Sequence, residues 1–125
     1  MITIIANVLA GLIGAGIIFI GIRGLLAPQG AAGFGIPDTP TEDPTFQAWL
    51  SVKAFRDIAS GLLIFIVMAG GSTQLLGWFM LAAALIPFGD ALTVLRSKGP
   101  RWAAYGVHGA TAAVMVVISA LLLIA

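Results

Sequence analysis

Five residues in the sequence carry side chains that could do chemistry: Lys53, Arg56, Asp57, Asp90 and His108. A carboxylate and an imidazole can exchange protons with a bound molecule, so Asp57, Asp90 and His108 are the candidate acid and base groups. Lysine and arginine can hold an anionic or carbonyl oxygen. Lys53 and Arg56 are therefore candidate ligand-binding residues.

The composition predicts that these polar residues belong to a membrane protein. Of the 125 residues, 60% are hydrophobic and 9% are charged, whereas about a quarter of the residues of a soluble domain are charged. A net charge of +1 without a basic run argues against nucleic-acid binding. The absence of cysteine excludes disulfides, iron–sulfur clusters and cysteine-based zinc sites. We expect a single domain, residues 1–125, without a cofactor.

The apolar stretches predict four membrane-spanning helices, because about 20 helical residues are needed to cross the hydrocarbon core. The predicted spans are residues 2–22, 50–69, 73–95 and 102–125, with a long first loop at 27–45. This loop is rich in glycine and proline, and we interpret it either as a lid or as a slack linker. The predicted fold class is an all-α integral membrane four-helix bundle.

The basic residues outside the predicted spans indicate how the bundle is oriented. Arg23, Lys98 and Arg101 lie in the first and third loops and Arg96 marks their membrane boundary, whereas the second loop and both termini contain no lysine or arginine. Loops rich in lysine and arginine stay in the cytoplasm. We therefore expect the first and third loops to be cytoplasmic and both termini to lie on the non-cytoplasmic side.

The candidate acid and base groups are predicted to share one depth in the membrane. Counted from the cytoplasmic ends of their helices, Asp57, Asp90 and His108 each lie about 9 to 10 Å deep. At about 100° per residue, the polar residues of the second helix also gather on one face. That face carries Lys53, Arg56, Asp57 and Ser60, and Ser60 becomes a further candidate ligand-binding residue.

The fourth helix shows a spacing that predicts which side faces the bundle. Alternating steps of four and three residues are typical of a helix seam, and the residues at this spacing are Arg101, Tyr105, His108, Ala112, Met115 and Ser119. His108 should therefore face protein. Tyr105, one turn away, could donate a proton or bind a ligand, although a bundle-facing phenol bonded to a backbone carbonyl is the commoner arrangement.

Proline and small residues predict local features of helix packing. Pro87 lacks the donor for the carbonyl of Ala83, so we expect a disturbed helix one turn before Asp90, with a packing kink as the favoured interpretation and a ligand wall as the alternative. Small residues also recur at four-residue spacing, as in Ala6, Ala10 and Gly14, and in Gly106 with Ala110 and Gly109 with Ala113. Such stripes indicate close helix contacts within the bundle or between copies in a homo-oligomer.

Three motifs together carry a resemblance to a known family. They are KAFRDIASG at 53–61, LIPFGDA at 85–91 and YGVHGAT at 105–111, and the run LLAPQGAAGFG after the first span agrees with them. The chain resembles a family of small four-span bacterial membrane proteins classed as a domain of unknown function, distantly similar to DoxX-like proteins. The resemblance implies a compact bundle in a bacterial cytoplasmic membrane and no settled activity. It singles out the same polar residues, and the third motif includes Thr111 as a candidate ligand-binding residue.

Several functions are compatible with these residues. The main interpretation is structural: Lys53 and Arg56 balance Asp57 and Asp90 in a buried ion-pair network. One alternative is the binding, or acid–base conversion, of a small lipophilic substrate at this polar layer. Another is proton-coupled transport by an oligomer, because four helices per copy are too few for a pathway. No metal site is expected, because the two cations would compete with a metal for the carboxylates. Membrane lipid is the one partner common to all of these interpretations.

Overall fold

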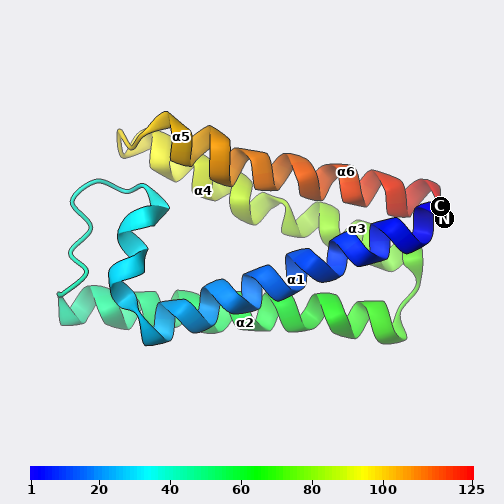
Figure 1. Ribbon diagram of the computed structural model, residues 1–125, viewed down its shortest axis with the longest axis horizontal. Coiled ribbons are helices and arrows are strands. Elements are labelled where there is room, and N and C mark those ends of the chain that lie inside the picture. Colours follow the sequence, from blue (N-terminus) through cyan, green and yellow to red (C-terminus); the bar gives the residue numbers. More distant parts are fainter.

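The computed structural model of the protein describes all 125 residues and contains helices and connecting segments without a strand. The predicted all-α class is confirmed. The elements are α1 (Ile2–Leu26), the 3-10 helix η1 (Pro28–Phe34), α2 (Pro44–Gly70), α3 (Thr73–Ala83), α4 (Leu85–Arg96), α5 (Arg101–Ala103), the π-helix η2 (Ala104–Gly109) and α6 (Ala110–Ile124) (Figure 1).

The helices are arranged as two pairs that diverge toward one end of the molecule. α1 packs along α2, while α3 packs against α6 and α4 against η2. Both termini lie at the end where the pairs converge, and η1 stands between the pairs at the opposite end (Figure 1). The first loop is therefore neither a free lid nor a slack linker along its whole length, because its first part is a helix inserted between the two pairs.

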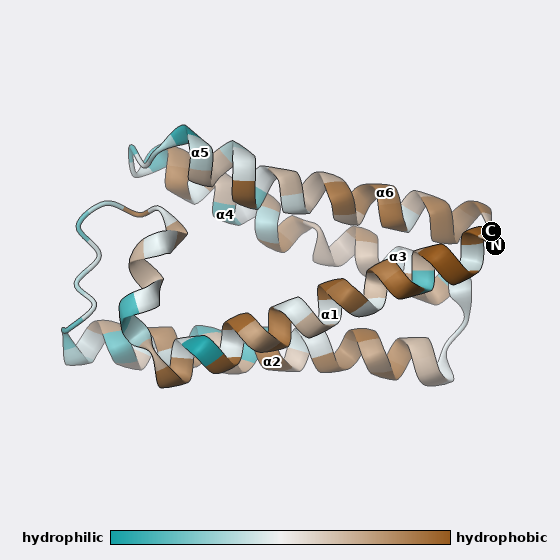
Figure 2. Cartoon of the chain, viewed as in Figure 1, coloured by the Kyte–Doolittle hydropathy of each residue, from teal (hydrophilic) through white to brown (hydrophobic).

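By length and composition, three helical stretches could cross a membrane: Ile2–Leu26, Thr73–Arg96 and Arg101–Ile124. Hydrophobic residues follow the helices, and hydrophilic residues gather at the end that carries η1 and the loops (Figure 2). Large apolar side chains on the outer surface, such as Leu12 and Val117, are more than half exposed. Such a surface is not that of a soluble protein, and the chain is a membrane protein.

α2 is 27 residues long but contains the charged residues of the first motif, and it is not among the apolar stretches. Its start agrees with the sequence. Asp43 caps the helix by accepting a hydrogen bond from the backbone N–H of Phe46 at 2.8 Å, and Pro44 occupies the first turn. Both features are common at helix N-termini, because the side-chain oxygen satisfies a free N–H and proline has none to satisfy.

The core lies at the end where the termini meet. Its buried residues come from α1, α2, α3 and α6 and from the short link Ala84, and they are Ala6, Ala10, Ile64, Leu76, Met80, Ala84, Met115, Ile118 and Leu122. The buried Ser119 hydroxyl donates a hydrogen bond of 2.8 Å to the carbonyl of Gly77, which ties α6 to α3. The predicted stripe of Ala6, Ala10 and Gly14 is buried as a helix contact.

The third predicted span is interrupted where Pro87 requires it. α3 ends at Ala83 and α4 begins at Leu85, two residues before the proline. The proline removes the hydrogen-bond donor for Ala83 and its ring crowds the preceding turn. Pro87 is buried, and neither Pro87 nor Ala83 lines the large cavity described below. The disturbance is therefore the packing kink that the sequence favoured.

Candidate functional site

A cavity of about 800 Å³ opens at the divergent end of the molecule. Its walls come from the end of α1, from η1 and the segment after it, from the first turns of α2 and from η2. The polar and aromatic side chains among the lining residues are Arg23, Asp38, Thr39, Lys53, Asp57, His108, Phe19, Phe34, Phe46 and Trp49. The cavity therefore combines an apolar wall with groups of both charges.

Phe34, the last residue of η1, lies between the polar residues of the two helix pairs. Its ring centroid is 4.3 Å from that of His108, and the Lys53 ammonium lies 5.6 Å from the same ring. Lys53 also pairs with Asp57 on its own helix, with 2.6 Å between Nζ and Oδ2. Phe34 thus connects the ion pair of α2 to the histidine of η2 through aromatic and cation–π contacts.

The hydrogen bond of His108 determines which ring nitrogen carries the proton. Nε2 lies 2.7 Å from the backbone carbonyl oxygen of Phe34, and a carbonyl can only accept, so Nε2–H donates. In the neutral ring Nδ1 is then an acceptor. Nδ1 lies 4.0 Å from Oδ2 of Asp90, so a proton bound at Nδ1 would be held next to a carboxylate. At 4.0 Å the two groups are too far apart for a direct hydrogen bond, and they form an ion pair only when His108 is protonated.

His108 takes this position because the helix is widened around it. Residues Ala104–Gly109 form a π-helix, η2, between the α-helical segments. A π turn contains an extra residue, which rotates the side chains around the turn relative to a regular α-helix, and such turns are frequent at functional sites. The side chain of His108 is 11% exposed, in agreement with the prediction that it faces protein.

The same widening explains where the sequence analysis was wrong about this helix. Tyr105, predicted to face the bundle, is 60% exposed. The prediction assumed an uninterrupted seam of alternating four- and three-residue steps from Arg101 to Ser119, but the extra residue in the π turn breaks that spacing. Ala112, Met115 and Ser119, which follow the π turn, are buried as predicted.

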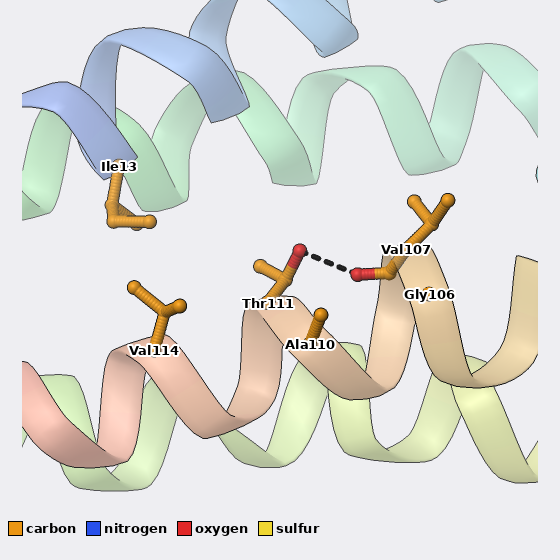
Figure 3. Close-up of a pocket in the computed structure, with 6 residues that line it drawn as sticks. All are labelled: Ile13, Gly106, Val107, Ala110, Thr111 and Val114. Atoms are coloured by element: carbon orange, nitrogen blue, oxygen red, sulfur yellow. Dashed lines mark hydrogen bonds between the residues drawn. The ribbon is translucent and has the colours of Figure 1, made fainter.

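The polar face predicted for α2 is only partly correct. Lys53 and Asp57 line the cavity, but Arg56 is exposed and takes part in neither of the two ion pairs. Ser60 and Thr111 hydrogen-bond to carbonyls of their own helices, at 2.8 Å to Arg56 and 2.7 Å to Val107 (Figure 3). Neither hydroxyl lines the large cavity.

The remaining candidates are Lys53, Asp57, Asp90 and His108. Lys53, Asp57 and His108 line the cavity, whereas Asp90 does not line it and lies 4.0 Å from Nδ1 of His108. Phe34, which is central to their contacts, was not singled out by sequence reasoning. The sequence feature that could have indicated Phe34 is its position as a lone aromatic residue between two glycines in the run LLAPQGAAGFG.

Close contact between the first and third loops holds Phe34 in place. Gly35 follows it with φ of +112°, and a Cβ there would lie 2.7 Å from the Cβ of Ala103. Gly99 packs so closely on the carbonyl of Gly35 that no side chain fits between them. A side chain at position 35 would also be strained by the positive φ. Both glycines are therefore required for η1 to reach the site.

A second, smaller groove of about 340 Å³ lies between α1 and α6. It is lined by Ile13, Gly106, Val107, Ala110, Thr111 and Val114. Ile13 points from α1 toward the side chains of α6 (Figure 3). Val107 lines this groove and also the large cavity, so the two spaces adjoin at this side chain.

The chain was compared with models of known protein families. The model of a domain of unknown function, DUF4267, matches residues 14–122. The matched segment contains η1, the Lys53–Asp57 pair, Asp90 and His108. No curated protein and no solved structure matches the chain.

Proposed function

We propose, from the premise that this chain belongs to the DUF4267 family of unknown function, that it binds a small lipophilic molecule with an anionic or carbonyl oxygen. The binding site is the cavity at the divergent end of the helix pairs. We further propose that α2 is the fourth membrane span, that the first and third loops are cytoplasmic, and that the site opens toward the inner leaflet of a bacterial cytoplasmic membrane. The distribution of basic residues supports this orientation.

The packing of α2 supports its assignment as a span. α2 packs along α1, which is one of the apolar stretches. Its apolar residues Phe55, Leu62 and Ile66 are at least half exposed on the outer surface, where lipid would cover them. Lys53 and Asp57 instead face the cavity. Charged residues in membrane helices are normally directed to such interior spaces.

The observation that carries the binding proposal is the cavity itself. Ligand pockets have volumes of about 300 to 1,000 Å³ and combine mostly apolar walls with a few polar groups. This cavity, at about 800 Å³, has aromatic walls and places Lys53 and His108 among them. The ammonium of Lys53 would hold a ligand oxygen, and the aromatic rings would cover an apolar ring or chain.

The ion pairs favour binding over a purely structural network. The pair of Lys53 and Asp57 lies within α2, and the pair of His108 and Asp90 connects η2 to α4. Neither pair joins α2 to the second helix pair, and Phe34 makes that connection instead. Lys53, Asp57 and His108 line the cavity, and this supports binding over a continuous ionic network across the helices.

Acid–base conversion of the bound molecule is a finer form of the same proposal. With Nε2–H donated to Phe34, Nδ1 of His108 is the nitrogen that can accept a proton, and Asp90 would stabilise the resulting imidazolium. Isomerisation, cyclisation and epoxide opening are reactions that such a pair could assist. Binding does not depend on this step.

The exchange Asp90→Asn tests the structural alternative. The Nδ1 to Oδ2 distance is 4.0 Å and the Asp90 side chain is 30% exposed, so we expect the protein to lose less than about 1 kcal/mol of stability. Thermal unfolding in detergent, followed by circular dichroism, measures this change. Asp38→Asn, at an exposed loop position, is the matched control. A loss of several kcal/mol in Asp90→Asn alone would favour the structural network instead.

The exchange His108→Ala tests binding. We expect it to weaken binding by about tenfold or more, equivalent to about 1.4 kcal/mol, because Phe34 loses its hydrogen bond and the ligand loses the imidazole. Isoprenoid, steroid and quinone compounds would be titrated in lipid nanodiscs, with the fluorescence of Trp49 in the cavity wall as the signal.

Tyr105→Phe is the control for this experiment, since Tyr105 lies on the same π-helix but is exposed. It should bind the same compounds with unchanged affinity. The proposal fails if no compound binds, or if every compound that binds has the same affinity for the His108→Ala variant as for the natural protein.

A further inference from the structure

Two features indicate which kind of ligand the cavity binds. They are the groove between α1 and α6 beside the cavity and Arg23, a cation outside both ion pairs. The groove between α1 and α6 shares the side chain of Val107, on η2, with the cavity. From Val107 to Val114 the groove follows η2 and the start of α6 for about 10 Å, at about 1.5 Å per residue. Its walls are apolar or small, and the hydroxyl of Thr111 is already bonded to the carbonyl of Val107. A single hydrocarbon chain could cover this apolar surface without leaving a polar group unbonded.

The cavity wall at the other end contains two cations, Arg23 and Lys53, and two acids, Asp38 and Asp57. The charges of Lys53 and Asp57 offset each other in their ion pair, although the ammonium of Lys53, whose side chain is 41% exposed, can donate further hydrogen bonds. Arg23 takes part in neither ion pair, and the ring of Phe19 lies 6.0 Å from its guanidinium. Arg23 is therefore the cation of the wall whose charge no ion pair offsets.

Arginine with lysine in a partly apolar cavity is suited to a carboxylate or phosphate oxygen. We infer that the ligand is a single-chain anionic amphiphile. Its head group lies with Arg23 and Lys53 in the cavity, and its tail passes Val107 into the groove between α1 and α6. This inference rests on the proposed function, because it uses the same cavity, but it adds the head-group charge and the path of the tail.

Binding of straight-chain carboxylates tests both parts. The full chain in phosphatidylcholine nanodiscs would be titrated with carboxylates of six to twelve carbons and with the alcohols of equal length, again followed by Trp49 fluorescence. We expect the carboxylate of each length to bind about tenfold or more tightly than the alcohol, as charge-assisted hydrogen bonds require. Affinity should also rise by about tenfold or more along the series, because each added methylene buries apolar surface.

Variants separate the head-group site from the tail path. Arg23→Gln should remove most of the preference for carboxylates and keep the dependence on chain length. Val114→Phe should remove the dependence on chain length and leave the binding of the six-carbon carboxylate unchanged, because Val114 lines the groove and not the cavity. Val116→Phe, at an exposed position of α6 outside both spaces, should behave as the natural protein. Ala110→Leu narrows the groove at a second position and should act as Val114→Phe does.

The outcomes distinguish this inference from the proposed function. If alcohols bind as tightly as carboxylates while His108→Ala still weakens binding, the cavity binds lipophiles but the anionic head group is wrong. If Val114→Phe and Val116→Phe bind the whole series equally, the tail does not follow the groove. If a two-chain anionic phospholipid displaces the carboxylates at lower concentration than a single-chain phosphate of equal tail length, the single-chain assignment is overturned.

Discussion

Replacing Gly61 by alanine is expected to destabilise the protein by about 2 to 3 kcal/mol, the usual range for an overpacked contact. A Cβ at position 61 would lie 2.5 Å from the carbonyl oxygen of Gly14 and 2.5 Å from Cγ1 of Ile18. The carbonyl is part of the α1 backbone and cannot rotate away, so α1 and α2 would have to separate. Small residues in membrane helices permit this kind of close approach.

Gly16→Ala is the matched control on the other helix of the pair. A Cβ there meets no atom within 4 Å, and alanine is favoured over glycine in helices by about 0.5 to 1 kcal/mol. The control should therefore be as stable as the natural protein or slightly more stable, so the two variants shift in opposite directions. Unfolding by heat or by added denaturing detergent, followed by circular dichroism, measures both. Equal stability of the two variants would mean that α1 and α2 do not approach as described.

Replacing Gly35 by alanine is expected to release η1 from the third loop and so dismantle the cavity. The positive φ of +112° is unfavourable for alanine, at a cost of about 1 to 3 kcal/mol. The Cβ would also meet that of Ala103 at 2.7 Å. We expect a local loss of about 2 to 4 kcal/mol, and Phe34 would leave His108 because it is held next to this glycine.

Amide hydrogen exchange of residues 28–36 measures this effect directly. A local loss of about 2.7 kcal/mol corresponds to about 100-fold faster exchange, since each 1.36 kcal/mol is a factor of ten. Exchange in α1 and α6 should stay slow, because the contacts of the core do not involve this loop. Gly33→Ala, where a Cβ meets no atom within 4 Å, is the control. If both variants exchange at the same rate, the docking of the first loop on the third is contradicted.

Several features of the fold follow from local sequence. Asp43 and Pro44 begin α2 because a cap and a first-turn proline satisfy the free backbone groups there. Pro87 interrupts the next helical stretch because it lacks an N–H. Lys53 and Asp57 pair because residues four apart lie on one face of a helix. Each of these effects acts within about one helical turn, so each can be inferred without knowing the neighbouring helices.

The predictions for Tyr105 and Arg56 failed for reasons that a single helix does not reveal. The seam that included Tyr105 assumed a constant helical repeat, and the π turn of η2 changed it. Arg56 shares a helix face with Lys53 within about 100°, but the cavity covers only part of that face. The width of the cavity determines which polar residues of α2 line it. That width depends on the position of the other helix pair.

The amino-acid sequence by itself determined that the protein lies in a membrane, that it is helical and which residues carry charge. These properties depend on composition and on sequence periods of a few residues. Tertiary structure alone decided that Phe34 meets His108, 74 positions away in the chain. That contact requires η1 to insert between the helix pairs and Gly35 to dock on Ala103. The first loop has no hydrophobic periodicity, so its sequence does not indicate which residues it contacts. Only the packed arrangement of the helices determines that Phe34 contacts His108.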